Sequence, residues 1–218
     1  MVTPAQTQTQ TQVQIHPHLI TTPEQLSHLF DEVGTASITK EVTYLHPHYR
    51  AMIEASPFAV LASHGPEGMD ASPRGDAPGF IVVEDEQTLL LPERRGNNRI
   101  DSLRNILSDP HVALLFLIPG AGETLRVNGR ASISIEPALL ERLAVDGKPP
   151  KCVLRIQVDA VYFQCARAIL RSRLWQRALD GKPDLPSPGT ILAALSNAEV
   201  DGEKYDSELP ARQRATLY

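Results

Sequence analysis

The chain has 218 residues, with 21 Lys and Arg against 26 Asp and Glu, which gives a formal net charge of −5. This acidic balance disfavours nucleic-acid binding, because a net basic face is needed to neutralise a phosphate backbone. A chain of 218 residues suits one β-barrel domain with added helices. No charged segment followed by an apolar run opens the sequence, and the longest apolar run, residues 112–118, is too short to span a bilayer. We therefore expect a cytoplasmic protein that binds no membrane.

The N-terminal part of the sequence offers little that a core could bury. Residues 6–12 alternate Gln and Thr, so residues 1–21 are predicted to be a flexible tail. A first helix is predicted after Thr22, because Thr22 and Gln25 have the spacing of a capping box and Pro23 suits the first helical position. A second helix is predicted over residues 47–55.

From Phe58 onward, short apolar segments alternate with turn residues, a pattern typical of a β-barrel. The predicted strands are residues 58–62, 80–83, 88–91, 112–118, 125–135 and 153–163. The sequence thus predicts a mainly β fold, a barrel with flanking helices, over residues 22–180. A short helix is expected after Ala166, and beyond Asp180 only residues 191–195 have a regular pattern. Residues 181–218 are predicted to form an extension that packs on the barrel or on a second subunit.

Two basic segments stand out in this acidic chain, and both are predicted to be turns: residues 72–76 and residues 92–99. Residues 98–108 have a helical period, which places the Gly96-Asn97-Asn98 turn at a helix N-terminus, where unpaired backbone N–H groups attract phosphate. A phosphate monoester needs donors from several directions, and guanidinium groups are the most effective. Arg74, Arg95 and Arg99 are the guanidinium groups that these two segments supply.

These residues occur in the same order as the phosphate-binding segments of a known family. Residues 58–163 resemble the pyridoxamine 5'-phosphate oxidase-like flavoproteins, which share an FMN-binding split β-barrel. The Arg-Gly-Asn-Asn-Arg segment, residues 95–99, and the Leu-Arg-Val-Asn-Gly-Arg-Ala strand, residues 125–131, carry the most specific part of the resemblance. Residues 165–175 resemble the tail of one bacterial branch of that family.

The resemblance implies FMN as the cofactor, a homodimer as the assembly, and a set of cofactor-binding residues. The residues implied around the phosphate are Ser72, Arg74, Arg95, Asn97, Asn98 and Arg99, and those implied beside the isoalloxazine are Thr124 and Arg126. Trp175, the single tryptophan, could stack on a flavin or close a packed edge. Cys152 and Cys165 are expected to be free thiols, and no residue pattern predicts a metal site.

The implied activity is that of an FMN-dependent oxidoreductase acting on a small molecule. A flavin carries the electron chemistry itself, which agrees with the lack of a recognisable acid–base dyad or nucleophilic triad in the sequence. The C-terminal substrate-binding arginine motif of the vitamin B6 oxidases is not recognisable here, so pyridoxamine phosphate is not the expected substrate. The alternative is a non-catalytic module that binds or carries a flavin, the deazaflavin F420 or haem.

Overall fold

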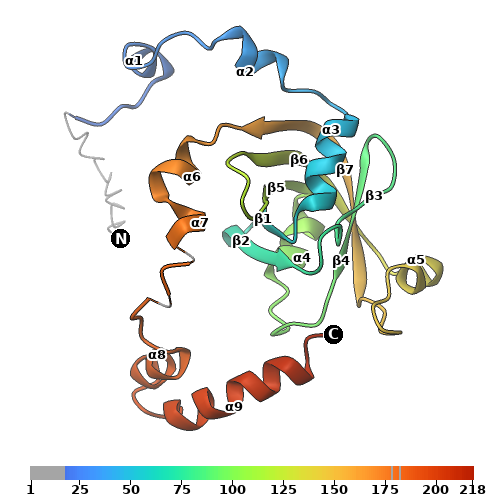
Figure 1. Ribbon diagram of the computed structural model, residues 1–218, viewed down its shortest axis with the longest axis vertical. Coiled ribbons are helices and arrows are strands. Elements are labelled where there is room, and N and C mark those ends of the chain that lie inside the picture. Colours follow the sequence, from blue (N-terminus) through green and yellow to red (C-terminus); the bar gives the residue numbers. More distant parts are fainter. Residues whose placement is uncertain (1–17, 178, 182) are drawn as a thin grey trace, which may run out of the picture. The chain divides into compact units, whose positions relative to one another are not determined.

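The computed structural model describes residues 18–177, 179–181 and 183–218, and the chain divides into two compact units between Ile38 and Thr39 (Figure 1). Helix α1 (Pro23–Ser27) lies in the first unit, and α2 (Thr35–Thr39) spans the division. The predicted capping box of α1 is confirmed, since the Gln25 N–H donates to Thr22 Oγ1 and the Thr22 N–H donates to Gln25 Oε1. The predicted flexible tail, residues 1–21, falls mostly outside the described residues.

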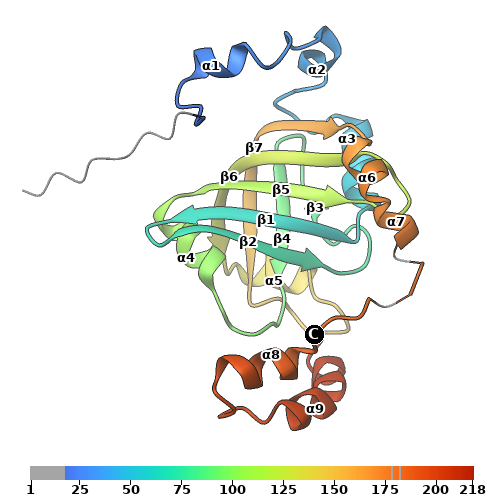
Figure 2. The same ribbon diagram turned by 90° about the vertical axis from the view of Figure 1, so that its left-hand side faces the viewer.

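The second unit is built on one antiparallel sheet of seven strands, in the order β2-β1-β5-β6-β7-β4-β3. Figure 2 shows β7, β6, β5, β1 and β2 side by side. The strands are β1 (Phe58–Gly65), β2 (Gly68–Gly75), β3 (Val82–Val83), β4 (Thr88–Glu93), β5 (His111–Leu117), β6 (Thr124–Ser134) and β7 (Cys152–Gln164). Among the described residues no ladder joins β2 to β3, so the curved sheet stays open along one side. The predicted split barrel with flanking helices is confirmed.

The main core lies on the inner face of this sheet, where alternate residues such as Leu61, Phe116 and Ile156 are fully buried. Helix α3 (Pro47–Ala55), predicted from the sequence, adds Ile53 to this core. Strand β4 is buried on both faces, which explains its unbroken apolar run. Its inner residues join the main core, while Leu90 packs in a second cluster with residues of α5 (Pro137–Arg142).

In the described residues after the last strand, the structure has four further helices: α6 (Arg167–Ser172), α7 (Leu174–Arg177), α8 (Pro188–Leu195) and α9 (Gly202–Ala215). The Asp206 carboxylate fixes α8 against α9, because it accepts the Gly189 N–H at 2.8 Å and the Ser187 hydroxyl. Helix α9 is absent from the sequence prediction. Its sequence has no apolar stripe, it buries no residue, and Pro210 lies inside it, so none of the usual periodic signals marks it.

The structure also corrects the interpretation of residues 72–76, which lie largely in strand β2 and not in a turn. β2 pairs only with β1, in register from Phe58 opposite Gly75 to Gly65 opposite Gly68. As an edge strand it has no fully buried residue, and its sequence is polar and contains Pro73. A polar edge strand lacks the apolar alternation by which strands are recognised. The strand predicted over residues 80–83 shortens to Val82–Val83.

Candidate functional site

A cavity of about 540 Å³ lies on the open side of the barrel, lined by β2, the end of β4, the segment that leads into α4 and the start of β7. This volume is within the usual range for small-molecule sites, about 300–1,000 Å³. Its lining contains five basic side chains: Arg74, Arg94, Arg95, Arg99 and Lys151. The carboxylates in the lining are Asp70, Glu93 and Asp101. Positive charge is therefore in excess at this place in an acidic chain.

Helix α4 (Asp101–Ser108) places its N-terminus in this cavity. The helix lies close to β1 because Gly65 has no side chain; a Cβ there would lie 2.1 Å from Asn105 Oδ1. Asn105 then donates from Nδ2 to Ser63 Oγ at 3.2 Å. No side chain of the described residues caps the helix N-terminus, so the N–H groups of its first turn have neither a capping side chain among these residues nor a partner within the helix. They are available to an anion in the cavity.

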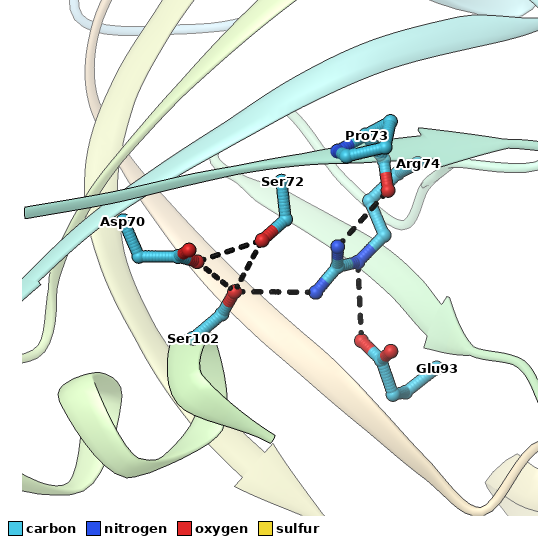
Figure 3. Close-up of polar contacts among 6 residues, drawn as sticks. All are labelled: Asp70, Ser72, Pro73, Arg74, Glu93 and Ser102. Atoms are coloured by element: carbon cyan, nitrogen blue, oxygen red, sulfur yellow. Dashed lines mark hydrogen bonds and ion pairs between the residues drawn. The ribbon is translucent and has the colours of Figure 1, made fainter. Parts of the chain in front are cut away.

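A hydrogen-bonded cluster of Asp70, Ser72, Arg74 and Ser102, here called the polar cluster, joins β2 to α4 (Figure 3). Asp70 Oδ2 accepts from Ser72 Oγ at 2.7 Å and from Ser102 Oγ at 2.6 Å. Arg74 donates from Nη2 to Ser102 Oγ at 3.4 Å. The polar cluster forms one wall of the cavity, and its members come from segments about thirty residues apart in the sequence.

Arg74 also spans the open side of the barrel. Its Nε lies 3.2 Å from Glu93 Oε2 on β4, and its Nη1 donates to Pro73 O at 3.0 Å. The side chains of this ion pair are only 15% and 21% exposed. A half-buried ion pair holds its partners more firmly than a solvated one, so the Arg74 guanidinium is fixed at the cavity wall.

The surroundings of two titratable groups in the cavity determine their protonation states at neutral pH. Hydrogen bonds from Ser102 and then Ser72 lower the pKa of Asp70, with help from the positive charges of Arg74 and Arg99, so Asp70 is ionised at neutral pH. Burial raises the pKa of the Cys152 thiol, and the charge of Glu93 adds to this effect. Cys152 therefore stays a protonated thiol and is a weak nucleophile at neutral pH.

The arginines of the segment 94–99 differ in how firmly their side chains are already bound within the protein. Arg94 is used internally, since Nε lies 3.1 Å from Asp76 Oδ2 and Nη1 donates to Leu143 O at 2.8 Å. Arg99 is 78% exposed and pairs with Asp101 at 2.9 Å. Within the part of the chain that the structure describes, the Arg95 side chain forms no ion pair or hydrogen bond. Arg95 is therefore the guanidinium group of this segment that is free to bind a ligand.

The two asparagines of the segment shape its backbone. Asn97 Oδ1 accepts the Arg99 N–H at 2.9 Å, and Asn98 adopts a positive φ of 60°, which asparagine tolerates better than most residues. Asn98 Oδ1 also accepts from Lys151 Nζ at 2.7 Å. The helix begins at Asp101 and not at the predicted Asn98, and residues 94–100 form an irregular segment with a bend at Asn97. The turn precedes the helix N-terminus and does not form it.

The structure brings six of the predicted site residues to this one cavity: Ser72, Arg74, Arg95, Asn97, Asn98 and Arg99. Thr124 and Arg126 lie on β6 outside its lining, and Arg126 Nη1 donates to Tyr162 Oη at 3.0 Å. Trp175 lies on α7, where its Nε1–H donates to Ala121 O at 2.6 Å. The roles of these three residues stay predictions, as do the roles of the six that line the cavity.

The sequence prediction missed Asp70, Glu93, Ser102 and Lys151, which line the same cavity. Ser102 has no clear signal, since it lies at the edge of the apolar side of the predicted helix, and only the structure shows it buried beside Asn105 and Ile106. Lys151 directly precedes a strand, and the sequence around it has no pattern that marks it as a site residue.

Both cysteines are free, Cys152 buried and Cys165 exposed. Among residues 18–177, 179–181 and 183–218, no cluster of His, Cys, Asp or Glu is arranged to hold a metal ion. In the same residues no helix has the length and apolarity needed to cross a membrane.

Comparisons with solved structures give distant similarities. HupZ of Group A Streptococcus is 21% identical over 55% of this chain and 94% of its own, with a TM-score of 0.45. A putative pyridoxamine 5'-phosphate oxidase from Lactobacillus delbrueckii is 17% identical over 56% of this chain and 95% of its own, with a TM-score of 0.44. A protein related to general stress protein 26, from Clostridium acetobutylicum, is 14% identical over 54% and 86% of the two chains, with a TM-score of 0.43.

No curated protein sequence matches the chain. The sequence profile described as pyridoxamine 5'-phosphate oxidase matches residues 45–165, which include every strand of the barrel and the whole lining of the cavity. Because this match spans more than half of the 218 residues, the chain belongs to the pyridoxamine 5'-phosphate oxidase family.

Proposed function

We propose that this protein is an FMN-binding flavoprotein that holds the flavin phosphate in the cavity between β2, β4 and α4. The observation that carries the proposal is the convergence of basic side chains and the uncapped N-terminus of α4 on one cavity. A phosphate monoester carries close to two negative charges at neutral pH and accepts several hydrogen bonds. Guanidinium groups and helix N–H groups are the donors that such a ligand needs.

The donors in the cavity fit a phosphate. Arg95 is uncommitted, and Arg99 is held only by an exposed ion pair with Asp101 that an entering anion could replace. Arg74 is fixed from one side by Glu93, so its guanidinium is already oriented. Members of the family commonly bind flavin, which supports the same conclusion. When bound, FMN supplies the electron transfer, and the residues of this chain hold and orient it.

We further propose an oxidoreductase activity on a small molecule other than pyridoxamine phosphate. The alternative is a non-catalytic carrier of flavin, F420 or haem. F420 also has a phosphate arm, so the same donors would hold it, whereas haem has no phosphate. A cytoplasmic location belongs to this proposal and rests on the sequence alone, as does the assignment of residues 181–218 as an extension.

The purified protein is expected to bind FMN much more tightly than riboflavin, which lacks the phosphate. Flavin fluorescence during titration measures both affinities, and the absorbance spectrum of any co-purified cofactor separates FMN, F420 and haem. Equal affinity for FMN and riboflavin would place the phosphate elsewhere, and absence of flavin binding would reject the proposed function.

Anaerobic mixing of the loaded protein with NADH, NADPH or pyridoxamine phosphate then tests the activity. No bleaching by any donor favours the carrier, and rapid bleaching by pyridoxamine phosphate contradicts the substrate proposal.

A homodimer with the flavin at the subunit boundary is the second part of the proposal. Val60, Leu115 and Arg126 lie side by side in the sheet register, on the face opposite the core, and all three are half-buried. Thr124 and Arg126 are not in the lining of their own cavity, so they would serve a flavin only from a partner. We expect light scattering of the flavin-bound protein to give twice the chain mass of 23.9 kDa. A mass of one chain at micromolar concentration would contradict the dimer.

A further inference from the structure

We propose that the Asp70 carboxylate competes with the flavin phosphate for the hydroxyl groups of Ser72 and Ser102, so that flavin binding is coupled to protonation of Asp70. This inference rests on the proposed function and adds to it a residue that tunes phosphate affinity and makes it depend on pH. It starts from the polar cluster, in which a carboxylate occupies the donors that an anion would use (Figure 3).

Each serine hydroxyl has a single hydrogen to donate. The Ser72 and Ser102 hydroxyl oxygens lie 2.7 Å and 2.6 Å from Asp70 Oδ2 and 3.2 Å from each other, and the two shorter distances favour donation of both hydrogens to the carboxylate. Arg74 reinforces this arrangement, because its Nη2 donates to Ser102 Oγ and leaves the hydrogen of that hydroxyl pointing away from the guanidinium. Because Ser102 is buried, bulk water cannot replace Asp70 as the acceptor of its hydroxyl hydrogen. In this arrangement neither hydroxyl can donate to a phosphate.

A phosphate that accepts hydrogen bonds from these two hydroxyls must displace Asp70 as their acceptor. Asp70 then loses the two hydrogen bonds that stabilise its ionised form and gains a negative neighbour. The charged groups that line the two cavities with Asp70 are mixed: the positive ones are Arg74, Arg94, Arg95, Arg99, Arg104 and Lys151, and the negative ones are Glu67, Glu93 and Asp101. Of these, Arg74 and Arg99 favour the ionised carboxylate. The phosphate adds negative charge and removes the two hydroxyl donors, and both changes act in the same direction. The pKa of Asp70 is higher in the complex than in the free protein.

The sign of the pH dependence follows from this difference. A group whose pKa rises on binding takes up a proton with the ligand, so affinity increases as the pH falls from the pKa of Asp70 in the complex to the lower pKa of Asp70 in the free protein. Below the pKa of free Asp70 the carboxyl is protonated in both states, and affinity becomes constant. The FMN phosphate has its own second pKa near ~6, and loss of the dianion weakens binding at lower pH. Comparison with a variant that lacks the Asp70 charge separates the two effects.

The Asp70→Asn variant keeps the shape of the side chain and an oxygen acceptor but removes the charge. We expect it to bind FMN about tenfold more tightly than the wild type at a pH of about 7.5, which equals ~1.4 kcal/mol. The advantage should stay constant down to the pKa of Asp70 in the wild-type complex and shrink below it, as Asp70 becomes protonated. Riboflavin affinity should be the same in both proteins. Glu141→Gln removes one charge from exposed α5 outside the cavity and should bind FMN like the wild type.

Three outcomes would overturn the inference. If wild type and Asp70→Asn bind FMN equally at every pH while riboflavin binds more weakly, the phosphate site stands and the competition does not. If Asp70→Asn tightens riboflavin as much as FMN, the effect is not competition for the phosphate. If neither protein binds FMN, the proposed function fails as well. Should the variant not fold, NMR titration of the Asp70 carboxyl carbon in the wild type decides, since its pKa must rise when inorganic phosphate or FMN is added.

Discussion

Arg74→Ala is expected to weaken FMN binding by about 2–5 kcal/mol, the range found when a buried, hydrogen-bonded charge loses its partner. Arg74 is the most firmly placed cation of the cavity, because its side chain is only 15% exposed and is held by Glu93 and Ser102. Arg99→Ala should cost less, since Arg99 is 78% exposed and water screens its charge. Fluorescence titration of both variants with FMN measures the difference.

The Arg74 variant needs a control, because it leaves Glu93 half-buried without its partner. Arg74→Ala combined with Glu93→Gln removes that unpaired charge, while the phosphate still lacks its guanidinium. The double variant should therefore recover stability but not FMN affinity. FMN binding by Arg74→Ala within about twofold of the wild type would mean that the phosphate lies elsewhere, since twofold is far below the expected loss.

Leu154→Ala is expected to lower the free energy of unfolding by about 2–5 kcal/mol. Leu154 is fully buried in β7, between β4 and β6, so truncation removes apolar contacts and leaves a cavity in the main core. Leu107→Ala is the matched control, because Leu107 on α4 is 78% exposed, and it should change stability by less than ~0.5 kcal/mol. Urea unfolding followed by circular dichroism measures both. Equal midpoints for the two variants would contradict the assigned core.

The sequence alone determined the elements whose signal is local. β6 and β7 were predicted to within one residue at each end, because one face of each is buried and apolar residues recur at every second position. The capping box of α1 could also be predicted from a local signal, because its donors and acceptors lie only three residues apart. Six residues of the cavity lining were named in advance, because the two basic segments of an acidic chain and the family resemblance both pointed to them, and their roles stay predictions.

The tertiary structure alone decided which of these residues remain available to a ligand. Arg94 and Arg95 are neighbours with the same chemistry, yet Arg94 is taken by Asp76 and by Leu143 O, and Arg95 is not. Asp70 and Ser102 meet only because Gly65 lets α4 lie against β1. These contacts join segments that are 18 to 49 residues apart in the chain. Hydrogen bonds over such separations depend on how strands and helices pack in three dimensions, and no local periodicity records that packing.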